Sequence, residues 1–241
     1  MSKYWNVEYY EQPNVTQLRK NAAESVKKEK KRGNVLEPVT VKGRDIVKNW
    51  WGKSWCSNLE QYADYESRID RGKRYVRNGS VIDLKIHKGK ISARVQGSRK
   101  TPYKIEIRIS PLSEEKCQHI IHKCSRKIEN MEELLNGNFP LEMQELFQGK
   151  DGLFPTPKEI GFTCSCPDWA LMCKHVAAAL YGVGVRLDEN PLLFFELRGI
   201  DVERFIDVTI ASRVETMLAN EGKQSSRIIE DEDITDLFGV L

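Results

Sequence analysis

The sequence of 241 residues lacks any apolar stretch that approaches the roughly 20 residues a helix needs to cross a bilayer. Its first residues, 1–6, are polar and no apolar core follows them, so nothing at this end resembles a secretory signal. We therefore expect a cytoplasmic protein. In that compartment thiols stay reduced, and they bind metals more readily than they form disulfides.

The sequence also lacks the signatures of hydrolytic enzymes. It contains no His-Glu-x-x-His, no cluster of carboxylates and no nucleophile motif. A hydrolytic metalloenzyme is therefore the least favoured of the functions considered. We expect a protein that binds rather than catalyses.

Cysteine and histidine are scarce, with six and four residues, yet four of them lie close together. Cys164 and Cys166 are followed after six residues by Cys173 and His175. Three thiolates and one imidazole make a complete tetrahedral set for zinc, and soft thiolates disfavour magnesium and calcium. Because no vertex is left for water, the pattern predicts one structural Zn²⁺ ion. A chance cluster of buried thiols and a set of disulfides are the alternatives.

The spacing of these residues also indicates local structure. An extended run over 162–166 places two sulfurs on one side, because side chains alternate along a strand. A turn at 167–168 then leads to a helix predicted over 174–181, with Gly182 and Gly184 ending it. A strand, a turn and a helix start thus converge on one ion.

These residues carry a family resemblance. The runs Cys-Ser-Cys-Pro-Asp-Trp at 164–169 and Cys-Lys-His-Val-Ala-Ala at 173–178 resemble the SWIM-type zinc finger. That resemblance implies binding to DNA or to other proteins. Stand-alone prokaryotic SWIM proteins are often encoded beside a Swi/Snf-type helicase-like ATPase, so the resemblance also implies such a partner. It extends over about residues 40–200, and further similar segments are 51–56, 71–79 and 95–98.

Charge is unevenly distributed, although the net charge is only +3. Residues 71–108 contain twelve basic residues and two acidic ones. Apolar and polar residues alternate in this window, which predicts an antiparallel meander with one buried face. Asn78-Gly79 indicates a hairpin turn, and the run 88–90 indicates another. The alternating segments are 82–86, 91–95 and 103–109.

The polar face of this sheet is basic and suits a phosphate backbone, because neutralising phosphates releases condensed counterions. The alternative is a solvated face whose charges are balanced by acids elsewhere in the fold. No aromatic residues are interleaved on this face, so base stacking is not favoured there. The nucleic acid is expected to be DNA, with RNA left open as the alternative. The predicted contacts are Arg74, Arg77, Lys85, Arg94, Lys104 and Arg108.

The flanking segments are predicted to be mainly scaffold. The basic run 17–32 is helical or disordered, and either touches nucleic acid or serves as a linker. Trp51 and Trp55 lie on one apolar helical face and are expected in the core rather than as a platform for bases. A helix over 113–129, and two apolar helices that cover the zinc core after residue 190, are also expected.

A second group of possible metal ligands lies within the helix predicted over 113–129. Its cysteines are about two turns apart, too far to share one ion on a straight helix, so we interpret them as small core residues. Cys56 has the same interpretation. The group consists of Cys117, His119, His122 and Cys124.

The last residues combine acids at 230–233 with the apolar residues Ile234, Leu237 and Phe238. This pattern is typical of a linear segment that orders on binding a partner. The alternative is that the tail packs on the basic sheet of its own chain and masks it.

We therefore predict an α+β protein, in which an antiparallel β-meander with packed helices precedes a zinc-nucleated helical module. The expected function is non-enzymatic: it binds zinc and nucleic acid and serves a Swi/Snf-type helicase-like ATPase as an accessory factor. The alternative is a protein-interaction adaptor for that ATPase without nucleic acid. The predicted regions are the basic arm 1–40, the sheet domain 41–150, the zinc finger with covering helices 151–220 and the tail 221–241.

Overall fold

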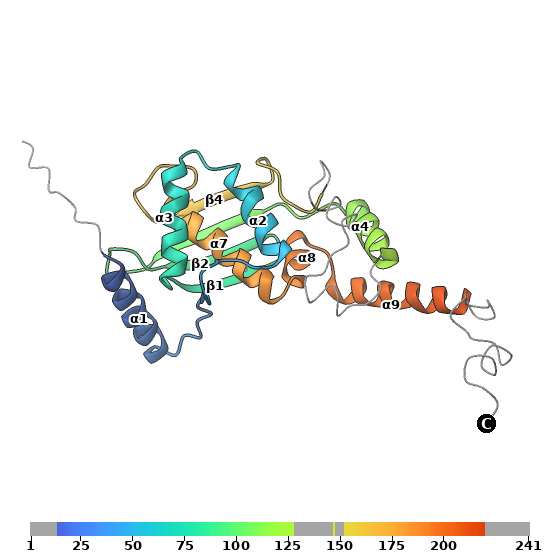
Figure 1. Cartoon of the computed structure of the whole chain (residues 1–241), viewed down its shortest axis with the longest axis horizontal. Helices are drawn as coiled ribbons and strands as arrows, with labels where there is room; N and C mark the ends of the chain where they lie inside the picture. The colour runs from blue at the N-terminus through green and yellow to red at the C-terminus, as the bar shows by residue number, and fades with distance from the viewer. Residues whose placement is uncertain (1–13, 128–146, 148–151, 220–241) are drawn as a thin grey trace, which may run out of the picture.

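Figure 1 shows the computed structural model of the chain, which describes residues 14–127, 147 and 152–219. The fold is α+β, as the sequence predicts, with helices packed on a four-stranded antiparallel sheet. In chain order the elements are α1 (Val15–Lys31), α2 (Trp50–Glu60), α3 (Glu66–Arg77), β1 (Val81–His87), β2 (Lys90–Val95), β3 (Tyr103–Ile109), α4 (Glu114–Lys127), β4 (Ile160–Cys164), α7 (Lys174–Glu189), α8 (Leu192–Arg198) and α9 (Val202–Ala219).

The sheet is a meander in the order β1-β2-β3-β4, and each neighbouring pair is antiparallel. The first three strands confirm the predicted alternation, and Gly89, with a φ of 67°, lies in the expected turn between β1 and β2. The extended run that carries the first two cysteines becomes β4, which pairs with β3. The segment that carries two of the predicted ligands is therefore part of the same sheet as the basic strands.

The hairpin predicted at Asn78-Gly79 is wrong, because these residues end helix α3 instead. The N–H groups of Gly79 and Ser80 donate to the carbonyls of Val76 and Tyr75, both at 3.0 Å. This is the Schellman pattern of helix termination, in which glycine adopts a positive φ, here 70°. An Asn-Gly pair suits both structures, since the hairpin turn also requires positive φ.

The cross-strand register gives the sheet two unlike faces. On the apolar face, Leu84, Ala93, Ile105 and Cys164 form one row across the strands. The polar face holds the predicted basic residues together with two acids. Its rows are Asp83, Arg94 and Lys104; Lys85, Ser92, Glu106 and Thr163; and His87, Lys90 and Arg108.

Helix α7 packs on the apolar face and contacts every strand, while α2 and α3 pack on α7 (Figure 1). The helix predicted over 174–181 continues to residue 189, so Gly182 and Gly184 do not end it. They lie where α7 closely approaches the sheet and helix α2. A Cβ on Gly182 would be 2.9 Å from Leu84 Cδ1, and one on Gly184 would be 2.9 Å from Cys56 Sγ.

One hydrophobic cluster joins the sheet with helices from both sides of it in the sequence. Trp51 and Trp55 are fully buried in it, which confirms their predicted place in the core, and Trp55 Nε1 donates to the Leu180 carbonyl at 2.9 Å. The described parts of the predicted regions 41–150 and 151–220 share this cluster and this sheet.

The peripheral helices mostly follow the predictions. The described part of the basic arm, residues 14–40, contains helix α1, which buries Leu18 and Ala22. Ser113 accepts from the Lys116 N–H and caps α4, and Gly199 ends α8 at a φ of 83°. Helix α9 packs on α4, whereas the sequence predicts that it covers the zinc core.

No helix in the described part of the chain is long and apolar enough to span a membrane. Several predictions concern residues outside the described part. These are residues 1–13, the tail residues Ile234, Leu237 and Phe238, and the side chain of Cys124.

Replacing Gly72 with alanine tests how closely α3 approaches α7. A Cβ there would lie 2.5 Å from the Ala177 Cβ and 3.0 Å from the backbone of Ala177 and Ala178. The gain in helix propensity, about 1 kcal/mol, is opposed by overpacking that costs about 1–3 kcal/mol. We expect a net loss in the free energy of unfolding, measured by urea denaturation.

Gly161→Ala is the matched control, because a Cβ at this position meets nothing within 4 Å. If both variants unfold at the same urea concentration as the original chain, the close approach of α3 and α7 is contradicted.

Candidate metal centre

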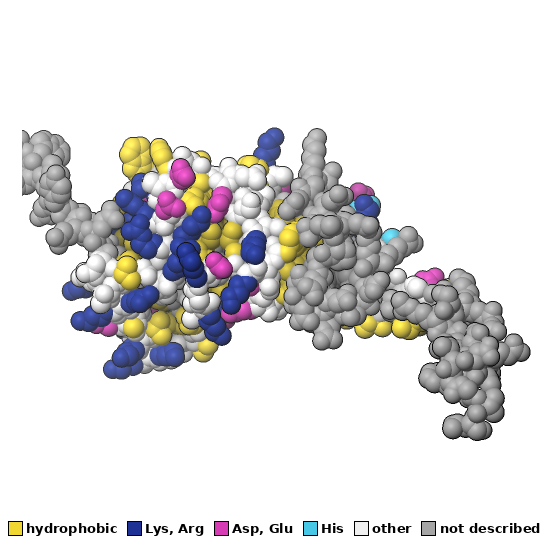
Figure 2. Space-filling model, in the orientation of Figure 1, with side chains coloured by type: hydrophobic (Ala, Val, Ile, Leu, Met, Phe, Trp, Pro, Cys, Tyr) yellow, Lys and Arg dark blue, Asp and Glu magenta, His cyan; other side chains and the backbone are white. Residues whose placement is uncertain are grey.

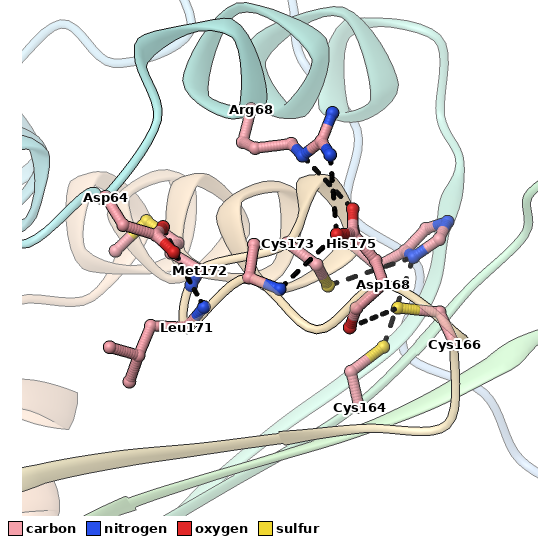
Figure 3. A network of polar contacts seen from close by, with 10 residues as sticks. Asp64, Arg68, Cys164, Cys166, Asp168, Leu171, Met172, Cys173 and His175 are labelled. Carbon is pink, nitrogen blue, oxygen red and sulfur yellow. Dashed lines mark hydrogen bonds and ion pairs between the residues drawn. The ribbon is translucent and has the colours of Figure 1, made fainter.

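Cys164, Cys166, Cys173 and His175 converge where the end of β4 meets the first turn of α7 (Figure 3). Their possible ligand atoms, three Sγ atoms and a ring nitrogen, all lie within 4.8 Å of one another. His175 Nδ1 is 4.0 Å from Cys164 Sγ and 3.9 Å from Cys173 Sγ. The structure thus brings together the four residues that the sequence predicts as ligands.

The local chain geometry explains why this spacing works. Along β4 and beyond it, half-buried and exposed residues alternate, so Cys164 and Cys166 both face inward. Cys164 pairs with Ile105 in the neighbouring strand. Cys173 is the N-cap of α7 and His175 lies in its first turn, and both are buried. Two ligands therefore come from a strand end and two from a helix start.

The loop between these two pairs, residues 167–172, is fixed by the segment that joins α2 to α3 (Figure 3). Arg68 Nε lies 3.1 Å from Asp168 Oδ2 in an ion pair. The Asp64 carboxylate accepts from the N–H groups of Leu171 and Met172, at 2.8 and 3.3 Å. The loop and the start of α3 consequently position each other.

The His175 imidazole is held between two tyrosine rings. Tyr103 stacks on it with ring centroids 4.0 Å apart, and Tyr75 meets it edge-on at 5.5 Å. Gly97 makes room for this stack, because a Cβ there would be 2.6 Å from the Tyr103 ring. His175 Nε2 is buried without a hydrogen-bond partner among the described residues, whereas Nδ1 faces the sulfurs. Nδ1 is therefore the ring atom presented to a metal.

The protonation of the cluster follows from burial and from contacts between the thiols. The hydrogen bond between Cys164 and Cys173 raises the pKa of Cys164 far above its usual range and lowers the pKa of Cys173. Burial raises the pKa of Cys166. Burial lowers the pKa of His175 and so favours the neutral imidazole that binds metals. A metal must therefore displace protons from Cys164 and Cys166.

The donor set fits a tetrahedral zinc ion. Zinc–ligand bonds of about 2.0–2.3 Å imply ligand atoms roughly 3.5–3.8 Å apart. The two sulfur–nitrogen distances are only slightly longer than this. Thiolate donors select zinc over oxygen-seeking cations. The cluster is thus a possible metal site whose residues suit zinc.

The other described cysteines do not join a metal cluster. Cys56 is buried, and burial raises its pKa to about 12. Cys117 is buried on α4, which confirms its predicted role in the core. His119 and His122 are exposed. Among the residues that the structure describes, the alternative set on α4 therefore forms no metal site.

The polar face of the sheet contains a groove of about 760 Å³ beside Cys164 and Ser165. Arg94, in its wall, forms ion pairs with Glu29 of α1 at 2.7 Å and with Asp83 at 3.4 Å. Hydrogen bonds from Asn34 and Arg94 lower the pKa of Glu29, so Glu29 carries its charge. The positive charge of Arg94 is consequently balanced.

Glu106 balances further basic residues on this face. It forms ion pairs with Lys90 and Arg108, both at 2.6 Å, and hydrogen bonds from these two residues lower its pKa. Lys85 and Lys104 have no acidic partner among the described residues. Of the four basic residues predicted on the sheet, Arg94 and Arg108 are thus paired with acids, and Lys85 and Lys104 are not paired within the described chain.

The other two predicted nucleic-acid contacts lie on a different surface. Arg74 and Arg77 are exposed on α3, which packs on α7, and α7 separates it from the sheet. With Arg71 they make a stripe at intervals of three residues, and none of the three has an acidic partner among the residues described. Figure 2 shows Lys and Arg side chains gathered over α3 and α1.

Sequence reasoning missed an exposed aromatic residue in the loop that Arg68 ties to the start of α3. Trp169, in the loop between the ligand pairs, is 98% exposed. A signal for it existed, because the alternation that points Cys164 and Cys166 inward places the odd-numbered residues 161–171 outward. No local pattern in the sequence indicated that Glu29 balances the charge of Arg94.

Comparison with known proteins gives one curated relative. A protein of Mycobacterium tuberculosis described as "Uncharacterized protein Rv2102" is 34% identical over 172 residues, or 70% of this chain. The aligned part is 62% of that protein, so the chain spans less than two thirds of its relative's length. No family model matches the chain, and no solved structure matches it.

Replacing Cys173 with serine should remove the metal and much of the stability. A structural zinc ion contributes folding free energy on the order of 10 kcal/mol in small units. The measurements are metal per chain by plasma mass spectrometry and the thermal unfolding temperature with and without a chelator. Cys117→Ser is the control and should keep its metal, since Cys117 lies outside the cluster. Equal metal content in both variants would contradict the assignment of the site.

Acidification should release the metal. The ligands bind only without their protons, and the pKa values of Cys164 and Cys166 are raised in the metal-free protein. Stability contributed by the metal is therefore complete at high pH and is lost as the pH falls. Metal released to a chromogenic chelator should rise between about pH 8 and about pH 5. Release that is independent of pH would rule out thiolate ligation.

Proposed function

We propose that this protein is a non-enzymatic accessory factor that holds one structural Zn²⁺ ion and binds nucleic acid. In this proposal it serves a Swi/Snf-type helicase-like ATPase, the partner implied by its resemblance to stand-alone SWIM proteins. The zinc ligands are Cys164, Cys166, Cys173 and His175. Four protein donors fill a tetrahedral shell, so the ion supplies cross-linking rather than a reactive water.

The observation that carries the nucleic-acid part is the basic stripe of α3, formed by Arg71, Arg74 and Arg77. Within the described chain these arginines have no acidic partner, in contrast to Arg94 and Arg108 of the sheet. Arginine also binds phosphate in a bidentate manner, with a geometry that lysine lacks. The α3 stripe is therefore the favoured contact with the phosphate backbone.

In this proposal the zinc site positions the helix that carries the α3 stripe. The loop between the ligand pairs is tied to the start of α3 by the Arg68–Asp168 ion pair and by Asp64. Tyr75 of α3 also packs against the ring of His175. Metal binding consequently fixes the helix that carries the arginines.

The groove on the sheet is the second place where phosphate could bind. Lys85 and Lys104 line it, together with the hydroxyls of Ser92 and Thr163. Its acids, Glu29, Asp83 and Glu106, make it less favourable than the α3 stripe. Because α7 lies between the two surfaces, charge reversal on each can be tested separately.

The alternative function, a protein-interaction adaptor, is favoured by the outer face of α9. Its exposed apolar residues are spaced by three and four and so form one stripe, which is typical of a helix that packs on a partner. In the adaptor, this stripe would contact the ATPase and nucleic acid would play no part. The stripe consists of Ile210, Val214, Met217 and Leu218.

Reversing charge on the α3 stripe should weaken nucleic-acid binding. Each phosphate contact adds about 0.9 to the slope of log affinity against log salt for duplex DNA and about 0.7 for single strands. The double variant Arg74→Glu/Arg77→Glu should therefore bind more weakly and with a slope lower by about two contacts. The measurement is binding of the zinc-loaded protein to labelled duplex and single-stranded DNA and RNA across a salt series.

The double variant Lys123→Glu/Lys158→Glu makes the same charge change away from α3 and should bind normally. A comparable loss in Lys85→Glu/Lys104→Glu alone would move the site to the sheet groove. If the folded, zinc-loaded protein binds no nucleic acid even at low salt, the accessory function is wrong. Loss of ATPase co-purification in Val214→Glu would then support the adaptor.

A further inference from the structure

The tip of the metal-binding loop exposes large apolar side chains. Trp169 is 98% exposed and Leu171 is 73% exposed, and Tyr65, just before α3, is 58% exposed. Trp51 and Trp55 are fully buried by comparison. Large apolar side chains that are exposed close together in the chain call for an explanation, because apolar patches mark interaction sites whereas a single exposed residue is normal.

The exposure of Trp169 does not follow from a loosely held loop. Its neighbour Asp168 is paired with Arg68, and Ala170 donates its N–H to the same carboxylate at 3.4 Å. Leu171, two residues after Trp169, donates its backbone N–H to the Asp64 carboxylate. The loop also begins and ends at metal ligands. The indole is thus presented outward by a backbone that is fixed on both sides.

The loop that carries this aromatic tip is tied to the start of the helix that bears the α3 stripe. The guanidinium of Arg68 lies 6.0 Å from the centre of the Tyr65 ring and pairs with Asp168, the chain neighbour of Trp169. The α3 stripe begins three residues further on, at Arg71. An aromatic platform beside basic residues is the combination that binds single-stranded nucleic acid, in which bases stack and phosphates are neutralised.

We propose that Trp169, assisted by Tyr65, stacks on an unpaired base of single-stranded nucleic acid whose backbone follows the α3 stripe. This inference rests on the proposed nucleic-acid function and gives it a substrate class. In a duplex the bases are stacked on one another, so an indole at the protein surface has no free face to cover. Charge complementarity favours this occupant over a protein, since the three arginines of the α3 stripe have no acidic partner in the described chain.

The test compares Trp169→Ala, Trp169→Phe and Leu171→Ala in binding to labelled single strands and to a duplex of the same sequence. Loss of one stacked base should weaken single-strand binding roughly 5- to 150-fold. Trp169→Phe should keep most of the affinity. Leu171→Ala, which changes an exposed aliphatic residue in the same loop, should change little. The metal content of each variant is measured in parallel.

The salt dependence separates stacking from charge. Trp169→Ala should lower affinity and leave the slope against salt unchanged, whereas Arg74→Glu/Arg77→Glu should reduce the slope. In a Trp5→Phe background, the fluorescence of the exposed indole should be quenched by a single strand more than by the duplex. Trp51 and Trp55 are fully buried and Trp50 is partly buried against Trp51, so these three should respond less than Trp169.

The outcomes distinguish the two proposals. If the original chain binds single strands and Trp169→Ala binds equally well, stacking is overturned and the nucleic-acid function stands. Equal losses for duplex and single strand, or for Leu171→Ala and Trp169→Ala, would also overturn it. Loss of ATPase binding with unchanged nucleic-acid affinity would make Trp169 a protein contact. If the original chain binds neither form, both proposals fail.

Discussion

Helix α7 approaches the apolar face of the sheet and helix α2 so closely that only glycine fits at two of its positions, and much of the fold depends on this close packing. Gly182 faces the sheet, and Gly184 faces α2. Protein interiors are packed as densely as organic crystals, so such contacts fix the position of a helix along its length. The first turn of α7 is thereby held over the end of β4. This is how Cys173 and His175 meet the two thiols of the strand.

The distribution of charge follows from the same architecture. Antiparallel pairing sets Glu106 on the polar face next to Lys90 and Arg108, and α1 brings Glu29 to Arg94. Charges on the sheet are therefore largely matched within the chain. Helix α3 lies on the outer side of α7, where no acid among the described residues pairs with the arginines of the α3 stripe. A basic stretch that is continuous in the sequence thus becomes two surfaces with different properties.

Features set by neighbouring residues could be predicted from the sequence. The alternation in β1 to β3 and the spacing of the four ligands are local, so the sheet and the metal cluster were foreseeable. Features set by distant segments could not be. Gly184 lies inside α7, where Cys56 of α2 leaves no room for a side chain. The charge of Arg94 is balanced by Glu29, which is 65 positions away in the sequence. Asn78-Gly79 was ambiguous, since a hairpin turn and a helix end both require positive φ.

The loop that carries Trp169 adds no strand to the sheet and no turn to α7. Its backbone lies between the candidate ligands Cys166 and Cys173 and is held by contacts with Asp64 and Arg68. Its outward side chains can therefore vary without loss of packing, as long as these anchors remain. Evolution, or an engineer, is consequently free to change the side chains exposed at residues 169 and 171 while the folded scaffold stays the same.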